Sequence, residues 1–152
     1  MKKGFTLVEI IVSCAVIAIL STVIYGTYSG MRERARDTQR MSDIEQLQLA
    51  LKLYKDSYGS YPSHDSGVVI GEGGALDTAL SSFFGTIPAD PLGPSAAGYN
   101  YMYDSDFNCP TVGPNVIMLY AESMERESNS NWDSECNGTE PGTNTYAVIL
   151  GR

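Results

Sequence analysis

The chain has 152 residues, with 18 acidic and 10 basic side chains and a formal net charge of −8 at pH 7. A chain this acidic is a poor partner for nucleic acid, whose phosphates are bound by lysine and arginine. It contains a single histidine and no recognisable Ser/His/Asp set, Cys/His set or phosphate-binding glycine motif. This composition argues against an enzyme.

The amino terminus combines two lysines, a glycine and an isolated acidic residue. Glu9 stands at the start of an otherwise uncharged segment that continues to Tyr28. A carboxylate inside a membrane costs about 2.5–3.5 kcal/mol on insertion scales and needs a partner. Cleavage after Gly4 would give Phe5 an α-amino group about one helical turn from Glu9. In packed copies, the amine of one copy could pair with the Glu9 of the next and set the axial register.

An alternative for the same residues is an ordinary signal anchor. Thr6 and Glu9 have the Thr-x-x-Glu spacing of a capping box, which marks the first turn of a helix. Capping and cleavage are compatible, because they use different atoms of the same segment.

The sequence Met1-Lys2-Lys3-Gly4-Phe5-Thr6-Leu7-Val8-Glu9 resembles the prepilin processing signal of type IV pilins and type II secretion pseudopilins. The resemblance implies that a prepilin peptidase cuts between Gly4 and Phe5 and methylates the new amino terminus at Phe5. It also implies that Phe5 and Glu9 take part in filament assembly. The expected partners are copies of the chain itself, the peptidase and an inner-membrane assembly platform.

The apolar segment from Ile10 to Tyr28 has the length of a membrane span. Its 19 residues fall within the roughly 17 to 25 that a transmembrane helix needs. The lysines before it and the arginines after it favour opposite orientations, and the processing signal favours an external carboxyl-terminal domain. We therefore expect a single-pass protein of the inner membrane, surrounded by lipid before assembly and part of a pilus or pseudopilus afterwards.

The apolar segment is followed by an amphipathic pattern. Large apolar residues recur at steps of three and four, which indicates one buried helical face: Ile44, Leu47, Leu51, Tyr54 and Tyr58. No proline interrupts the chain from Phe5 to Tyr61, so one helix is predicted from Phe5 to about Tyr58. The expected divisions are a leader at 1–4, a membrane and filament-core helix at 5–30, its amphipathic continuation at 31–58 and an external domain at 59–152.

The external domain is predicted to be small, acidic and partly built of strands. The expected elements are a glycine-rich loop at 67–74, a short helix at 75–84, a turn at 87–93, and strands at 99–103, 116–121 and 145–150. The predicted fold class is α+β, with a long amino-terminal helix packed on a small antiparallel sheet in a pilin-like arrangement. Pro-Ala-Asp-Pro-Leu-Gly at 88–93, followed by Tyr-Asn-Tyr at 99–101, resembles the major pseudopilin of type II secretion.

The three cysteines are of two kinds. Cys14 lies in the apolar segment, where a thiol is usually a small hydrophobic group. Cys109 and Cys136 lie in the expected external domain, and an oxidising compartment favours a disulfide between them over free thiols or metal ligands.

The acidic stretch after Tyr103 offers oxygen atoms at alternate positions, namely Asp104, Asp106 and Asn108. Calcium prefers such ligands, and the residues from 129 to 135 could add more. The spacing fails the EF-hand pattern, because Cys109 occupies the glycine position and Asn115 the twelfth. The sequence favours a solvated acidic loop, with a calcium site as the alternative; no cofactor is required.

The function predicted from these features is that of a structural subunit of a type IV pilus or a type II secretion pseudopilus. The alternative is a monomeric, membrane-anchored binding module whose external domain captures calcium or a protein ligand. The two differ in whether the chain is cut at Gly4 and assembles.

Overall fold

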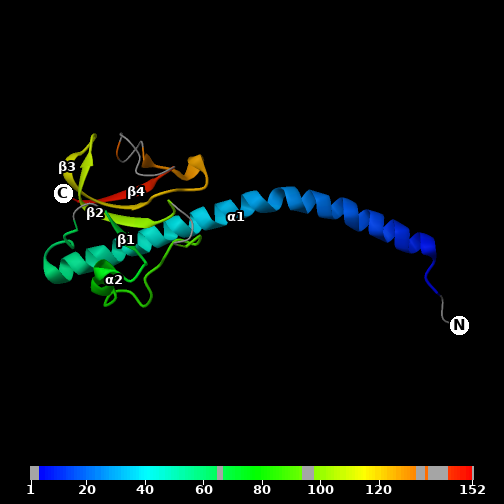
Figure 1. Ribbon diagram of the computed structural model, residues 1–152, viewed down its shortest axis with the longest axis horizontal. Helices are drawn as coiled ribbons and strands as arrows, with labels where there is room; N and C mark the ends of the chain where they lie inside the picture. Colours follow the sequence, from blue (N-terminus) through cyan, green and yellow to red (C-terminus); the bar gives the residue numbers. More distant parts are fainter. Residues whose placement is uncertain (1–3, 65–66, 94–97, 133–135, 137–143, 152) are drawn as a thin grey trace. The chain divides into compact units, whose positions relative to one another are not determined.

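The computed structural model describes residues 4–64, 67–93, 98–132, 136 and 144–151, and of residues 23–27 only the backbone. The leader residues 1–3 lie outside the described part. The chain divides into two compact units, Met1–Arg34 and Ala35–Arg152. One helix, α1 (Leu7–Tyr58), begins in the first unit and ends in the second (Figure 1).

The long predicted helix is confirmed, and the structure explains where it ends. Gly59 follows the last helical residue with a φ of +83°, and its N–H donates to the carbonyl of Lys55 at 2.7 Å. Glycine adopts this left-handed conformation without the strain of a Cβ atom, and it commonly closes helices in this way.

The structure confirms the predicted buried face of the helix from Ile44 to Tyr54. Ile44, Leu47 and Leu51 are fully buried, and Tyr54 is half-buried. Tyr58 was expected on the same face, but 64% of it is exposed. Its ring instead lies 4.5 Å from the ring of Tyr54, between centroids, at the surface.

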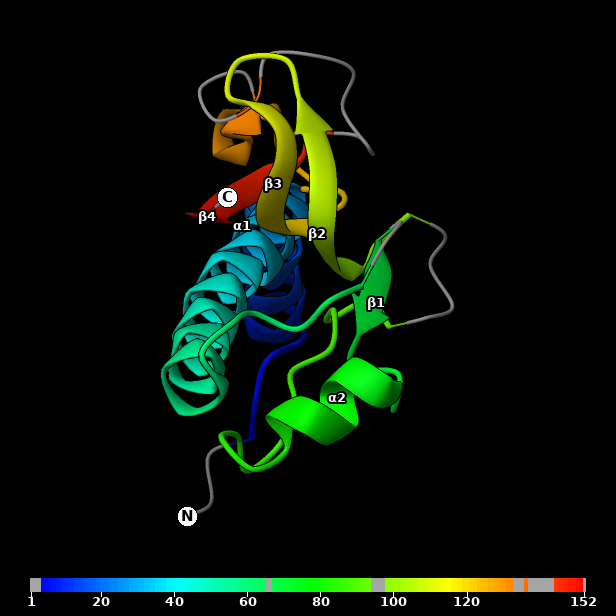
Figure 2. The same cartoon turned by 90° about the vertical axis from the view of Figure 1, so that its left-hand side faces the viewer.

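The second unit contains a four-stranded antiparallel sheet, so the predicted α+β class is confirmed. The strands lie in the order β1 (Val68–Ile70), β2 (Tyr101–Cys109), β3 (Gly113–Ala121) and β4 (Tyr146–Gly151). Residues 67–74 were predicted to be a loop, but β1 lies within them and pairs with the start of β2. The sequence pattern does not predict β1, because the strand consists of only three residues, all of them β-branched. Figure 2 shows the strands, with the short helix α2 beside β1.

The helix α2 (Ala75–Leu80) is shorter than the predicted 75–84. It begins after a glycine-rich turn that is held by one carboxylate. Asp77 accepts hydrogen bonds from the backbone N–H groups of Gly71, Gly73 and Gly74, at 2.7–3.2 Å. The chain then turns at Phe83 and Phe84, and both N–H groups bond to the carbonyl of Leu80.

The two faces of the sheet are buried against different parts of the chain. Alternate residues of a strand point to opposite faces. Tyr101 and Tyr103 belong to a core that includes Leu47 and Leu51 of α1. Residues on the other face form a second cluster with Trp132 of the connection between β3 and β4: Val116, Met118, Tyr120 and Ala147.

The predicted disulfide between Cys109 and Cys136 is present, with the two Cα atoms 5.3 Å apart. It joins the end of β2 to the β3–β4 connection. Both cysteines are fully buried, and the nearby ring of Trp132 packs edge-on against Phe107 at 5.6 Å between centroids. The disulfide therefore holds the β3–β4 connection against the second cluster.

The same connection also contacts the outer edge of β4. The side-chain amide of Asn131 donates to the carbonyl of Ala147 at 2.7 Å and accepts from its N–H at 2.6 Å. Further along β4, the hydroxyl of Tyr61 donates to the carbonyl of Leu150 at 3.2 Å. Side chains thus satisfy backbone groups that a neighbouring strand would otherwise bond.

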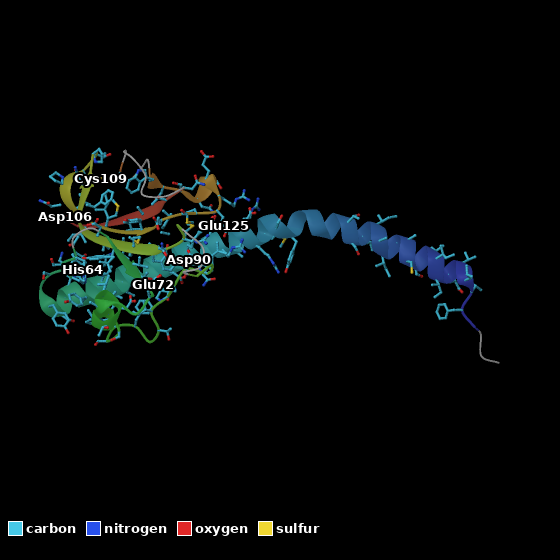
Figure 3. The ribbon with its side chains drawn as sticks, viewed as in Figure 1. His64, Glu72, Asp90, Asp106, Cys109 and Glu125 are labelled. Carbon is cyan, nitrogen blue, oxygen red and sulfur yellow. A yellow bond between two sulfur atoms is a disulfide. The ribbon has the colours of Figure 1, made fainter. Side chains whose placement is uncertain are left out.

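A cluster of buried charges, the Arg40 cluster, joins α1 to two distant segments. It consists of Arg36, Asp37 and Arg40 on α1, Asp90 in the 87–93 turn and Glu125 after β3. The Arg40 side chain is fully buried and donates two hydrogen bonds to Asp90 at 2.6 and 3.0 Å. It also donates to Asp37 at 2.7 Å and to Glu125 at 3.1 Å. Figure 3 labels Asp90 and Glu125 beside α1.

Asp37 extends the cluster into the backbone of the β3–β4 connection. Its carboxylate accepts from the N–H groups of Glu125 and Arg126 at 2.9 and 3.1 Å, and from the side-chain amide of Asn129 at 2.9 Å. A buried carboxylate is stable only with such donors, because transfer of an unpaired charge out of water costs several kcal/mol.

The pKa values of the cluster follow from these bonds. Burial alone would lower the pKa of the Arg40 guanidinium, but the hydrogen bonds and charge of Asp90 raise it, as do the bonds to Asp37 and Glu125. The hydrogen bond from Arg36 is the main cause that lowers the pKa of Glu125, against the opposing effect of burial. Both groups are therefore charged at neutral pH.

Removal of the disulfide should destabilise the domain. Replacing Cys109 and Cys136 by serine removes a cross-link that restricts the conformations of the unfolded chain. For a separation of 27 residues, loop-closure entropy predicts that the unfolding free energy falls by about 3–4 kcal/mol. Urea unfolding of the full-length protein in detergent, followed by the fluorescence of Trp132, measures the loss. Cys14→Ser is the control, and an equal loss in this variant would contradict the assignment.

Replacement of Arg40 by methionine should cost about 3–5 kcal/mol of unfolding free energy, because it leaves three carboxylates near one another without their shared cation. The same unfolding experiment measures the effect. Lys52→Met, at an exposed position of the same helix, is the matched control and should change the stability by less than about 0.5 kcal/mol. Similar values for the two variants would show that the cluster does not hold the domain together.

The Glu125 carboxylate should make stability sensitive to acid. Its pKa is lower in the folded state than the ordinary value of 4.5, so its stabilisation is complete above that value and is lost as the pH falls through the folded-state pKa. In Glu125→Gln, unfolding free energy should therefore be lower at pH 7 and should fall less between pH 5 and acid. Glu127→Gln, at an exposed position of the same connection, should keep the wild-type pH profile.

Candidate functional site

The candidate site is the amino-terminal segment from Gly4 to Leu20. Every described residue of this segment is exposed, and its large apolar side chains are between 50% and 84% exposed: Phe5, Leu7, Val8, Ile10, Ile11, Val12, Val16, Ile17, Ile19 and Leu20. The apolar surface of these side chains is therefore available for contact with other molecules. Within the residues whose side chains are described, no helix is both long enough and apolar enough to cross a membrane.

The only charge in this segment, Glu9, is bound by the first turn of α1. The backbone N–H and the hydroxyl of Thr6 donate to Oε2 of Glu9 at 2.8 and 2.7 Å. The N–H of Glu9 donates in return to the hydroxyl oxygen of Thr6 at 3.3 Å. This is the reciprocal capping box that the sequence suggested as an alternative. Oε1 takes part in neither bond.

Gly4 and Phe5 precede the helix in a stretch without regular secondary structure. A methyl group added at Gly4 would meet no described atom within 4 Å, so packing inside the chain does not require glycine there. Phe5 is 84% exposed. The structure thus places the predicted cleavage point in accessible backbone immediately before the capping box.

The predicted calcium ligands lie on a strand and not in a loop. Asp104, Asp106 and Asn108 all belong to β2, in the part where its pairing with β3 shifts register. A strand advances about 3.3 Å per residue, which spreads alternate side chains along its length. Asp104 is buried and accepts the N–H of Asp106 at 2.9 Å, whereas Asp106 and Asn108 are exposed.

No described residues gather as a group of three or more His, Cys, Asp or Glu side chains that could hold a metal ion. Residues 133–135, which the sequence analysis considered as further ligands, lie outside the described part. Figure 3 shows Asp106 and Cys109 at the other end of the domain from Glu125.

The comparison with protein families finds a match at the amino terminus. Residues 1–25 match the prokaryotic N-terminal methylation motif. The match covers the capping box and the candidate cleavage point, together with most of the exposed apolar segment.

Curated relatives extend the similarity into the second unit. The chain is similar to the type II secretion system core protein G of Pectobacterium carotovorum, with 34% identity over 67 residues, which are 44% of this chain and 43% of that protein. The protein of the same name from Escherichia coli is 28% identical over 77% of this chain and 85% of its own length. The one from Pseudomonas aeruginosa is 26% identical over 88% and 96%.

The chain is therefore similar to type II secretion core proteins, and it shares the prokaryotic N-terminal methylation motif, as its resemblance to pilins and pseudopilins predicted. Its alignment with the Pectobacterium protein spans less than half of that protein's length. No solved structure matches the chain. The named relatives of this pseudopilin-like chain are core proteins of a secretion system and not enzymes, in agreement with the sequence analysis.

Sequence reasoning missed the Arg40 cluster. The sequence shows a run of mixed charges around Arg36 and Asp37, and such a run by itself does not distinguish ion pairs from solvated side chains. In the structure Asp37 and Arg40 are fully buried within their own domain. Their i, i+3 spacing on the predicted helix was visible, but their partners lie some 50 and 85 positions further along the chain and carry no local signal.

Proposed function

We propose that the protein is a structural subunit of a type II secretion pseudopilus, cut between Gly4 and Phe5 and assembled into a helical filament. The observation that carries the proposal is the exposed apolar start of α1, which lies within a methylation motif and whose only charge as far as Leu20 is the carboxylate of Glu9. Such a surface requires an apolar environment around it.

The membrane and then the filament supply that environment in turn. Before assembly, lipid of the inner membrane covers the segment, and the acidic domain lies outside. During assembly, neighbouring copies replace the lipid. Transfer from lipid to protein yields little hydrophobic free energy, so close packing and polar pairing must favour the assembled state.

Glu9 is the polar group that distinguishes the two states. In the single chain, the two donors of Thr6 stabilise its carboxylate. Prepilin peptidase creates a cationic amine at Phe5, and in the filament this amine pairs with Glu9 of an adjoining copy. Oε1, which Thr6 does not use, is available to it. The pair forms only at one axial offset between copies, so it selects the register.

The names of the relatives favour a pseudopilus over a surface pilus, because each of the three is a core protein of type II secretion. The further partners of the proposal are an inner-membrane assembly platform and the peptidase. No cofactor takes part in it.

The proposal predicts separate effects for two substitutions. Glu9→Ala should be cut and methylated normally and should stay in the membrane, but its filament yield should fall at least about tenfold, because the ion pair that selects the register is lost. Gly4→Leu should block the cut. Mass spectrometry of the amino terminus and the yield of sheared filaments measure the two effects.

Glu9→Gln separates charge from hydrogen bonding, because it keeps an acceptor for Thr6 but cannot form the ion pair. It should assemble as poorly as Glu9→Ala. Normal filaments from either Glu9 variant would refute the register role, and a wild-type protein that keeps Met1 and forms no filaments would refute the proposed function.

A further inference from the structure

The next charged side chain of α1 after Glu9 is Arg32, and it folds back toward the uncharged segment. Arg32 is exposed, and its Nη2 group donates a hydrogen bond to the hydroxyl of Tyr28 at 2.9 Å. Its guanidinium carbon lies 4.4 Å from the centre of the Tyr28 ring, which is itself 51% exposed. The positive charge is therefore held at the level of Tyr28, one helical turn closer to the uncharged segment than the backbone of Arg32.

The charge of Arg32 is not balanced within the described part of the chain. Arg36 and Arg40 form ion pairs with carboxylates, but Arg32 forms none with the described residues. The adjacent Glu33 does not face it, because neighbouring residues of a helix point in different directions. Tyr28 takes one of the five N–H donors of the guanidinium. The remaining donors suit an acidic group with two oxygen atoms, such as a carboxylate or a phosphate.

The position of this pair along α1 favours the phosphate of a phospholipid. No charge lies between Glu9 and Arg32. Glu9 and Tyr28 are about 28 Å apart along the helix, close to the roughly 30 Å of a bilayer's hydrocarbon core. Tyrosine is enriched at the boundary between hydrocarbon and headgroups, because its ring is apolar and its hydroxyl is polar. An arginine at that boundary meets the layer of lipid phosphates.

We propose that Arg32 and Tyr28 together bind the phosphate of a phospholipid in the external leaflet of the membrane. This inference rests on the proposed function, which places the start of α1 in the membrane before assembly. It adds the lipid group that holds the helix at a fixed depth. Arg32 donates to the phosphate oxygens, and Tyr28 orients the guanidinium at the boundary.

The fixed depth has a consequence for Glu9. With Tyr28 at the external boundary, the helix length of about 28 Å places Glu9 at the cytoplasmic boundary and not at the centre of the bilayer. Its carboxylate and the capping box with Thr6 then remain within reach of water. The insertion cost of a carboxylate is lower there than at the centre.

Solid-state NMR tests the contact directly. The full-length protein, labelled with ¹³C at the guanidinium carbon of its arginines, is placed in vesicles of phosphatidylcholine and phosphatidylglycerol. A phosphate that accepts hydrogen bonds from Arg32 lies close enough for its ³¹P nucleus to dephase the ¹³C signal. Arg32→Lys keeps the positive charge but removes the label, and the dephasing should fall at least about twofold. Arg34→Lys, on another face of the helix, is the matched control and should keep the wild-type dephasing.

A second sample distinguishes a lipid phosphate from a free one. The labelled protein in a maltoside detergent, which contains no phosphorus, is mixed with inorganic phosphate. A single exposed guanidinium attracts a free anion only weakly in water, so no dephasing is expected.

The depth of the helix is measured at Cys14. This thiol is free and exposed, whereas Cys109 and Cys136 are joined, so a nitroxide label attaches at Cys14 alone. The label should lie about 7 Å from the level of Glu9 along the helix. Without both groups, in Tyr28→Ala combined with Arg32→Gln, the helix can slide about 5 Å toward the cytoplasm, one turn.

Electron paramagnetic resonance detects this shift through collisions of the label with a water-soluble nickel complex. The collision rate should rise at least about twofold in the double variant, because the label moves toward the headgroups. Lys52→Gln, at an exposed position of α1 in the second unit, should leave the rate unchanged.

The outcomes separate this inference from the proposed function. Dephasing that is lost in Arg32→Lys and kept in Arg34→Lys, together with the shifted label, supports the lipid site. Wild-type vesicles without dephasing, equal losses in the two lysine variants, equal dephasing by inorganic phosphate or an unmoved label overturn it and leave the proposed function standing. A wild-type chain that neither enters membranes nor forms filaments overturns the proposed function itself.

Discussion

A single buried guanidinium holds the domain to its helix. Arg40 has no contact with water, so its charge must be balanced by groups that the fold brings to it, and these come from α1, from the turn at 87–93 and from the segment after β3. An arrangement that satisfied only one of these carboxylates would leave buried charge uncompensated. The three segments therefore dock together or not at all.

This constraint explains how the two parts of α1 differ. In the second unit the helix is fastened by charge on one turn and by Ile44, Leu47 and Leu51 on the next turns, so its inner face has partners within the chain. In the first unit the described apolar side chains are exposed, and the carboxylate of Glu9 is held by its own helix cap. The chain thus completes its own core and leaves the amino-terminal surface to other molecules.

Structural elements that depend on residues close together in the sequence could be predicted. Contacts between residues far apart in the sequence could not. The helix, its glycine stop, the antiparallel sheet and the disulfide follow from periodicity, turn residues and cysteine placement. β1 was missed because three residues give too short a pattern, and α2 was overestimated because Ser81 and Ser82 do not continue the helix. The supposed loop at Asp104 is strand, because Asp104 pairs with Met118 and Phe107 pairs with Val116 on β3. The Arg40 cluster had no local signal, because its carboxylates meet only in the folded chain.

The amide of Asn131 on the edge of β4 would matter in the proposed filament, where copies of the chain lie close together. A bare strand edge is a template on which an identical strand can add, and the growth of sheets between chains has no natural end point. By occupying both backbone groups of Ala147, Asn131 withdraws them from such pairing. In the proposed filament, association through helices could then proceed at high local concentration without competition from amyloid-like stacking.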